Sequence, residues 1–179
     1  ELTTLDISHN LLERRLPDSI EGMRNLQTLL LNDNNIEGGL PSSIGTLRRL
    51  QHLNLARNRL TVGLPDTLAN CDNLELIDLQ NNQIDGPLPA GIWRLQMLEY
   101  LLMTGNRVRG PLPEGIGYLA QIREIRLDRN LIDGTIPATI GDAVTLEVLR
   151  MDDNRLSGSI PSTMGQLRNV LNLDLHKNA

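Results

Sequence analysis

Phenylalanine is absent from the sequence, and aromatic residues of any kind make up only 2% of its 179 residues. Most globular cores include several aromatic side chains, because each can bury about 150–250 Å² of surface. Hydrophobic residues nevertheless make up 40% of the chain, which is enough to build a core. The missing aromatics therefore exclude an ordinary mixed core and indicate one built almost entirely from aliphatic side chains.

Positive charge and long apolar runs are also lacking. The chain has 17 lysine and arginine residues against 22 aspartate and glutamate residues, a formal net charge of −5. A surface that binds phosphate groups needs the opposite balance, so we predict no nucleic-acid partner. No apolar stretch approaches the roughly 18–20 residues that a transmembrane helix requires, so we predict no direct membrane insertion by this segment.

Cysteine and histidine are too few for disulfide or metal chemistry. The single Cys71 cannot form an internal disulfide, and the three histidines fall in widely separated parts of the chain. Asp128, Asp152 and Asp153 are interleaved with arginines, which favours ion pairs over a cation site. No nucleophile stands where a histidine could activate it. We therefore predict that the chain is not an enzyme and that it binds no cofactor or metal.

What the sequence does contain is a repeat of 24 residues that runs without interruption. Seven units are complete and an eighth stops at the last residue; the units begin at Leu2, Leu26, Leu50, Leu74, Leu98, Ile122, Leu146 and Val170. We expect a single repeat domain over residues 1–179. Because it opens and closes inside a repeat, which would leave stacked apolar ends exposed, we expect it to be a segment of a longer chain without its terminal caps.

Each unit opens with the pattern Leu-x-x-Leu-x-Leu, which alternates apolar and polar residues. This pattern predicts a short strand with one buried face, and stacked units would join the strands into a parallel sheet. The ninth position of every unit is asparagine, which predicts a ladder of buried amides bonded to the backbone of the turns. Its members are Asn10, Asn34, Asn58, Asn82, Asn106, Asn130, Asn154 and Asn178.

The second half of each unit predicts a return path on the other side of the core. Glycine at the thirteenth position of five units indicates a backbone with positive φ, although Arg14 and Val62 break this rule. Proline at the sixteenth position of all seven complete units indicates an extended segment, followed by a helical or 3-10 turn. Cys71 takes a position that leucine holds in other units, so we expect it to be a small buried hydrophobe.

These positions together resemble the plant-specific class of leucine-rich repeats. Residues 26–49 and 146–169 match the pattern Leu-x-x-Leu-x-Leu-x-x-Asn-x-Leu-x-Gly-x-Ile-Pro-x-x-Ile-Gly-x-Leu almost throughout. The resemblance implies an α/β repeat solenoid, a right-handed curved superhelix with parallel strands on its concave face and short 3-10 or helical turns on its convex face. Proteins of this class include the ectodomains of receptor-like kinases and receptor-like proteins, and polygalacturonase inhibitors.

The side chains that the strands turn away from the core vary from unit to unit, and they are the candidate binding residues. Leu76, Tyr100 and Leu102 form an exposed apolar group on neighbouring strands. Arg126 and Arg150 follow on the next two strands and could form charge-assisted bonds with an acidic group of a ligand. The Arg-x-Arg pair that peptide receptors of this class often place on a concave strand is not found on the predicted strands.

Three functions are compatible with this sequence. The first is a non-catalytic module that recognises a protein or peptide on its concave face. The second is a structural or assembly subunit of a larger complex that uses its edges or convex side, and the third is the ectodomain fragment of a receptor-like kinase. The compartment stays open: the resemblance implies an extracellular or membrane-tethered protein, whereas the single cysteine and the lack of any Asn-x-Ser/Thr glycosylation sequence favour an intracellular one.

Overall fold

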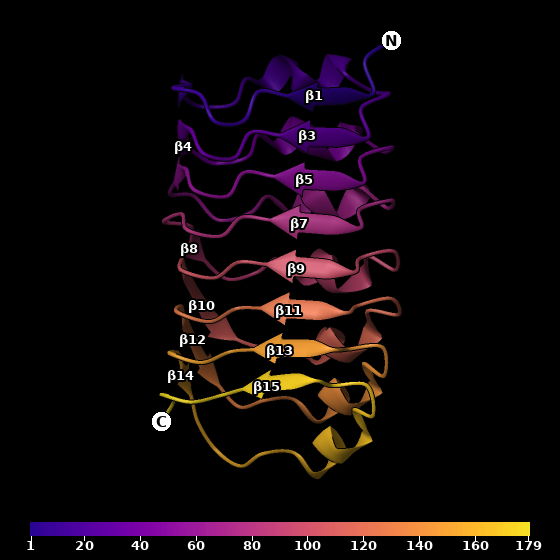
Figure 1. Cartoon of the computed structure of the whole chain (residues 1–179), viewed down its shortest axis with the longest axis vertical. Coiled ribbons are helices and arrows are strands. Elements are labelled where there is room, and N and C mark those ends of the chain that lie inside the picture. The colour runs from indigo at the N-terminus through magenta and orange to yellow at the C-terminus, as the bar shows by residue number, and fades with distance from the viewer.

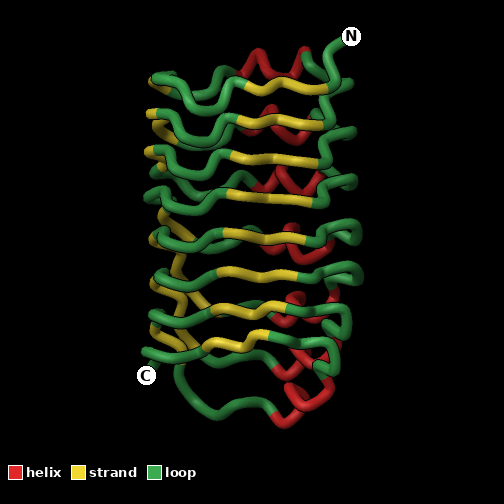
Figure 2. The backbone as a smooth tube through the Cα atoms, in the orientation of Figure 1, coloured by secondary structure: helices red, strands yellow, loops and turns green.

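The computed structural model describes all 179 residues and consists of stacked coils, one for each repeat unit (Figure 1). Every coil contributes one strand to a single sheet on one side, and the 3-10 helices lie on the opposite side of the core (Figure 2). The two termini lie at opposite ends of the stack. The predicted solenoid with parallel strands and short 3-10 turns is confirmed.

The main sheet has eight parallel strands that follow one another in chain order. They are β1 (Thr4–Asp6), β3 (Thr28–Leu30), β5 (His52–Asn54), β7 (Leu76–Asp78), β9 (Tyr100–Leu102), β11 (Glu124–Arg126), β13 (Val148–Arg150) and β15 (Asn172–Asp174). The middle residue of each inner strand points into the core, where Leu29, Ile77 and Leu149 are fully buried. Because side chains alternate along a strand, the residues on either side point to one outer surface, which we call the strand face.

A second set of short parallel strands follows the asparagine turns and was not predicted from the sequence. One sheet contains β2 (Glu13–Arg14), β4 (Asn35–Gly38) and β6 (Arg59–Leu60), and the other contains β8 (Asp85–Gly86), β10 (Arg107–Pro111), β12 (Leu131–Gly134) and β14 (Arg155–Leu156). Only an isolated bridge between Val62 and Asp85 joins the two sheets. The stack is therefore held by backbone pairing on two sides, with one interruption in the third unit.

The interruption coincides with the missing glycine of the repeat. The thirteenth residue has a positive φ in all five units where it is glycine, for example 77° at Gly38, and Arg14 adopts 67° at the same position. Val62 does not adopt this conformation. A β-branched side chain is strongly disfavoured at positive φ, so the third unit takes another path and its pairing with the next unit is reduced to a single bridge.

Proline precedes each 3-10 helix, as the sequence predicted. Pro41 and Pro89 have φ values of −67° and −61° in extended backbone, which is the geometry that the proline ring imposes. The helices are η1 (Asp18–Gly22), η2 (Ser42–Thr46), η3 (Asp66–Asn70), η4 (Ala90–Arg94), η5 (Glu114–Tyr118), η6 (Ala138–Asp142) and η7 (Ser162–Gln166). None of them has the length and apolarity needed to cross a membrane.

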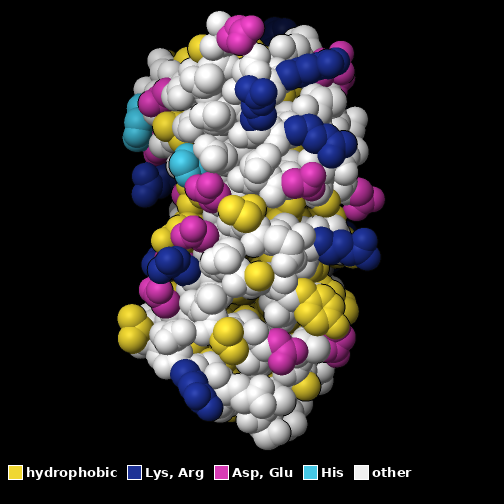
Figure 3. Space-filling model, turned by 90° about the vertical axis from the view of Figure 1, so that its right-hand side faces the viewer, with side chains coloured by type: hydrophobic (Ala, Val, Ile, Leu, Met, Phe, Trp, Pro, Cys, Tyr) yellow, Lys and Arg dark blue, Asp and Glu magenta, His cyan; other side chains and the backbone are white.

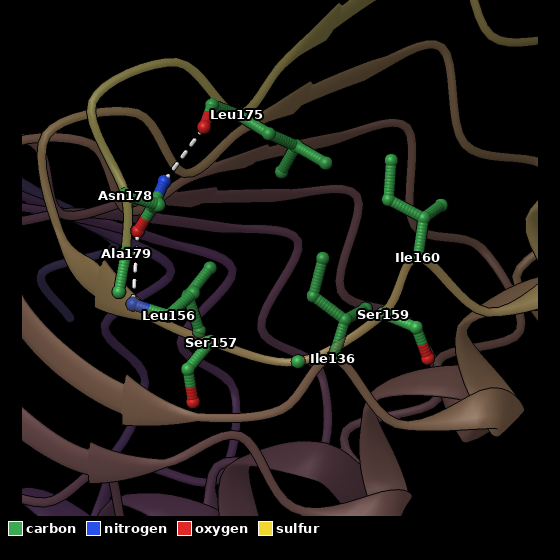
Figure 4. A pocket seen from close by; sticks show the side chains of 9 residues that line it. Ile136, Leu156, Ser157, Ser159, Ile160, Leu175, Asn178 and Ala179 are labelled. Atoms are coloured by element: carbon green, nitrogen blue, oxygen red, sulfur yellow. Dashed lines mark hydrogen bonds between the residues drawn. The ribbon is translucent and has the colours of Figure 1, made fainter.

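The asparagine side chains tie each coil to the coil before it. Asn82 Nδ2 donates to the carbonyl of Leu55 in the preceding unit at 2.9 Å and to that of Leu79 in its own unit at 3.1 Å. Its Oδ1 accepts the backbone N–H of Leu60 at 3.0 Å. Figure 4 shows two of the corresponding bonds of Asn178 at the end of the stack: its Nδ2 donates to the carbonyl of Leu175, and its Oδ1 accepts the backbone N–H of Leu156. The amide thus satisfies backbone groups that the turn leaves without a partner.

The first asparagine departs from this pattern. Asn10 is exposed, and its side-chain amide donates only within its own unit, to the carbonyls of Ile7 at 3.2 Å and Ser8 at 2.8 Å. This side chain makes no bond to a neighbouring coil. The inter-coil ladder therefore comprises the seven asparagines from Asn34 to Asn178. The predicted burial is confirmed for the five from Asn34 to Asn130, whereas Asn154 and Asn178 are partly buried and Asn10 is exposed.

One aliphatic core runs the length of the stack. Cys71 is fully buried within it, as predicted, and its thiol donates to the carbonyl of Ile44 at 3.3 Å. Burial raises the pKa of the Cys71 thiol to about 11. The thiol is therefore protonated in the folded protein at neutral pH, and it packs as an apolar group.

Replacing a ladder asparagine should destabilise the fold in proportion to its bonds between coils. We expect Asn82→Ala to lower the free energy of unfolding by about 1–3 kcal/mol, because buried backbone groups lose their partner. Asn10→Ala is the matched control at the same repeat position and should have a smaller effect. Urea melts of both variants measure this, and equal losses would show that the bonds between coils contribute nothing.

The buried thiol predicts a loss of stability at alkaline pH. In the unfolded chain Cys71 ionises near pH 8.5, whereas its pKa in the folded protein is about 11. The stabilisation is thus complete below about pH 8.5 and declines as the pH rises towards 11. Urea melts at about pH 8 and pH 10 should show a larger loss for the wild type than for Cys71→Ala; equal losses would mean that the native thiol is accessible to water.

Candidate functional site

The parallel register gathers the candidate residues on adjoining strands of the strand face. Tyr100 of β9 pairs with Leu76 of β7. Two residues further along β9, Leu102 points to the same side and pairs with Arg126 of β11. Arg126 in turn pairs with Arg150 of β13. Residues that are far apart in the sequence thus form one continuous surface over the fourth to seventh units.

The apolar members of this group are partly exposed. Leu76, Tyr100 and Leu102 have intermediate exposure, whereas Ile77 and Leu101 between them are fully buried. The exposed trio does not belong to the buried core cluster. Because they fill no core position, trimming these side chains would not open a cavity inside the fold.

Both candidate arginines are already paired on their own coils, which the sequence did not reveal. Arg126 Nε donates to the carboxylate of Glu124, two residues earlier in the same strand. Arg150 Nη2 and Nε donate to Asp152 Oδ1 at 3.3 and 3.4 Å. A guanidinium held in this way has fewer donors left for a ligand. The pairing therefore weighs against the acidic ligand group that the sequence led us to expect at these arginines.

Carboxylates outnumber the cations around Arg150. Asp174 Oδ2 lies 4.0 Å from Nη2, and Asp152 is in hydrogen-bond contact. Burial by itself would lower the pKa of Arg150, but the charges of Asp128, Asp152 and Asp174 outweigh this effect and hold the pKa above its ordinary value. Asp128 is fully buried and accepts a hydrogen bond from Thr104 Oγ1 at 2.7 Å. Asp128 and Asp152 thus lie in ion pairs with Arg129 and Arg150, as the interleaved arginines indicated, whereas Asp153 forms no ion pair.

One group among these ion pairs has the donor atoms of a metal site. Asp152, Asp174 and His176 each place one such atom within 4.8 Å of the others. His176 Nδ1 lies 2.6 Å from Asp174 Oδ1, and this bond, with that of the His176 backbone N–H, lowers the pKa of Asp174. Arg150 is close to both aspartates, and its charge opposes a cation between them. The geometry favours an ion-pair network over a metal centre.

A polar network beside the apolar group was also missed from the sequence. His52 Nε2 lies 3.5 Å from Glu75 Oε2, and Gln51 Nε2 donates to Glu75 Oε1 at 3.4 Å. Glu75 is at the second position of its unit, just before the strand. The alternation of side chains along the strand therefore does not predict on which side of the sheet Glu75 lies. The signal that could have located this network is the run of charged residues at the second position of four consecutive units, from Glu75 to Glu147.

Two other surfaces lie outside the strand face. The pocket drawn in Figure 4 is lined by Leu156, Ile160 and Leu175, whose counterparts in earlier units pack in the core, so its lining belongs to the repeat. Along the edge where the 3-10 helices lead back to the strands, Tyr118 is 59% exposed and Val144 is 55% exposed. Figure 3 faces this edge and shows hydrophobic side chains among charged groups of both signs.

A stack of parallel coils joined by an asparagine ladder defines a repeat protein whose variable side chains are displayed on one sheet surface. Models described as leucine rich repeat match residues 48–108, and also residues 1–23, 25–47 and 145–167. The chain belongs to the leucine-rich repeat family. A comparison with curated proteins finds no significant match.

Solved structures with this fold include plant receptors. The plant peptide hormone receptor RGFR1, in complex with RGF2, is 33% identical with a TM-score of 0.98 over 99% of this chain and 28% of its own. The Arabidopsis receptor kinase HAESA, in complex with the peptide hormone IDA and the co-receptor SERK1, is 30% identical with a TM-score of 0.95 over 99% and 30%. An LRR protein of Leptospira interrogans is 30% identical with a TM-score of 0.78 over 92% and 40%. This chain thus spans less than a third of each plant receptor chain.

We expect the protein to be stable without metal. Adding a chelator, or adding zinc, should shift the melting temperature by no more than about one degree, because Arg150 lies where its charge opposes a cation between Asp152 and Asp174. His176→Gln, which removes one donor atom, is the control and should behave in the same way. A fall of several degrees with chelator, absent in His176→Gln, would instead identify Asp152, Asp174 and His176 as metal ligands.

Proposed function

We propose that the chain is a non-catalytic recognition module that binds an extended peptide or protein segment on its strand face, which the fold class predicts to be concave. The observation that carries this proposal is the register that aligns Leu76 with Tyr100 and places Leu102 beside them, with Arg126 and Arg150 at the border. Partly exposed apolar side chains with a polar rim are typical of protein contact sites.

The related structures support this proposal. RGFR1 is a plant peptide hormone receptor in complex with RGF2, and HAESA is in complex with the peptide hormone IDA. Each is similar to 99% of the present chain. The likeness supports a peptide or protein ligand over a small molecule. It also supports the hypothesis that the chain is part of a receptor-like kinase ectodomain, because HAESA is a receptor kinase and is longer than this chain.

A second candidate function is that of an assembly subunit that uses its edge. Met97, Tyr118 and Val144 are 49%, 59% and 55% exposed in three successive units. Tyr118 ends the 3-10 helix η5, and Met97 and Val144 lie on the loops that follow η4 and η6. Large apolar side chains exposed on neighbouring units also occur at protein interfaces. The experiment that tests the first function distinguishes the two, because each surface holds one of the two tyrosines.

Tyr100 should be the residue on which peptide binding depends most. We expect Tyr100→Ala to weaken binding by about 2 kcal/mol or more, roughly 30-fold, because large aromatic side chains concentrate binding energy when a partner desolvates them. Peptides are first selected from a random display library on the immobilised wild-type protein, and their affinities for both proteins are then measured. The melting temperature should be unchanged, since the side chain fills no core position.

Tyr118→Ala is the matched control, because it removes the same side chain from the edge. It should leave the affinity of the selected peptides unchanged. The proposal would be contradicted if partners were lost with Tyr118→Ala and kept with Tyr100→Ala. That outcome would assign recognition to the edge and support the assembly subunit.

A further inference from the structure

The negative charge of the chain is concentrated on the strand face. The strand face together with the positions that flank it, which are the second, third, fifth and seventh positions of the eight units, carries nine carboxylates and three arginines, a formal charge of −6 with neutral histidines. Asp128 and Asp152 are buried, so the groups of this face that are at least partly exposed carry −4. The whole chain carries −5 from 22 acidic and 17 basic residues, so thirteen acidic and fourteen basic residues remain elsewhere. The acidity is therefore a property of this face and not of the surface in general.

The three arginines of the face leave little positive charge for a ligand. Arg123 bridges Glu99 and Glu147 with distances of 3.1 Å to each. Arg126 and Arg150 have the carboxylate partners described above. A ligand carboxylate could reach these guanidinium groups only by displacing a carboxylate that is already in place.

Two carboxylates beside the apolar group have no lysine or arginine partner. Glu75 and Asp78 stand on either side of Leu76 along the chain. No lysine or arginine side chain lies within 4.0 Å of Glu75, and its neighbour there is the imidazole of His52, at 3.5 Å. Asp78 accepts hydrogen bonds only from the backbone N–H and the amide of Gln80, at 3.2 and 3.1 Å. Both carboxylates therefore keep acceptor capacity for a partner.

We infer that the partner of the strand face is a basic peptide segment in which lysine or arginine flanks a few apolar residues; this inference rests on the proposed function. The apolar residues would cover Leu76, Tyr100 and Leu102, and the neighbouring cations would meet Glu75 and Asp78. Complementary charge steers such a segment to the face, whereas an acidic segment would meet carboxylates without compensation.

The size of the face indicates how long the recognised segment is. The strands from β7 to β13 are three spacings apart, about 14 Å at about 4.8 Å each. An extended peptide that crosses them advances about 3.3 Å per residue, so about four or five residues span the apolar group and its charged neighbours. Acidic side chains on both sides of a basic one are visible along the left-hand border of Figure 3, where this face is seen in profile.

The test uses the peptides selected from the random library and compares two double variants. Glu75→Gln/Asp78→Asn neutralises the free carboxylates with side chains of the same shape. Glu37→Gln/Asp133→Asn removes the same charge from exposed carboxylates of the second sheets, for which the structure shows no ion pair, and is the control. Thermal melts verify that both are folded. Binding of the wild type at about 50 and about 500 mM NaCl supplies a measurement that needs no variant.

We expect the selected peptides to have a net positive charge and to bind at least tenfold more weakly at the higher salt concentration. The strand-face variant should lose at least tenfold in affinity, and the control less than twofold. Peptides that need Tyr100 but are neutral or acidic would overturn the basic partner and leave the proposed function intact. Equal losses in both variants would also overturn it, because they indicate attraction to the overall charge. If no selected peptide depends on Tyr100, the proposed function fails, and this inference fails with it.

Discussion

The hydrogen bonds between each asparagine amide and the backbone of two neighbouring coils are the interaction on which the rest of the structure depends. A chain that turns sharply after a three-residue strand leaves backbone N–H and C=O groups that no sheet or helix can satisfy. One amide, such as that of Asn82, satisfies groups on both coils. Because the bonds cross from coil to coil, they also set the spacing and register of the stack.

The turn that carries the asparagine is constrained enough to override local preference. The residue just before it has a left-handed backbone in every unit, with φ between 51° and 70°, although only Gly105 is a glycine. Arg57, Arg129 and Lys177 adopt this conformation despite the strain, which costs on the order of 1 kcal/mol or more per residue. Such strain persists only where the surroundings determine the conformation completely, and here the ladder and the buried leucines do so.

The periodicity of the sequence predicted most of this fold, because the same few positions recur in every unit and each recurrence supports the same structural role. The sequence predicts four features correctly, because the side chains at those positions each fit only one structural role. They are the strands, the amide ladder, the 3-10 helices that follow proline, and the burial of Cys71. The second sheets were not predicted, since their pairing depends on backbone path and not on an apolar pattern. Trp93 was missed because it occupies a slot that glycine holds in other units, yet it is only 2% exposed. The candidate site could be predicted in part. The regular repeat length predicts the register that aligns Leu76 with Tyr100, whereas the pairing of Arg126 with Glu124 could not be predicted because it depends on side-chain rotamers.

The distribution of carboxylates has no explanation in the stability of the fold. Glu75 and Glu99 occupy the same position on adjacent coils, just before β7 and β9, where their like charges repel each other. Arg123 compensates Glu99, but Glu75 has only a histidine nearby. Neither the asparagine ladder nor the leucine core requires a charged residue at this position. A neutral residue would avoid the repulsion, as Gln27 and Gln51 do in earlier units. The charge of Glu75 thus destabilises the fold at a position that has no structural role. A partner that neutralises this charge would explain it, and the basic peptide segment inferred above would do so.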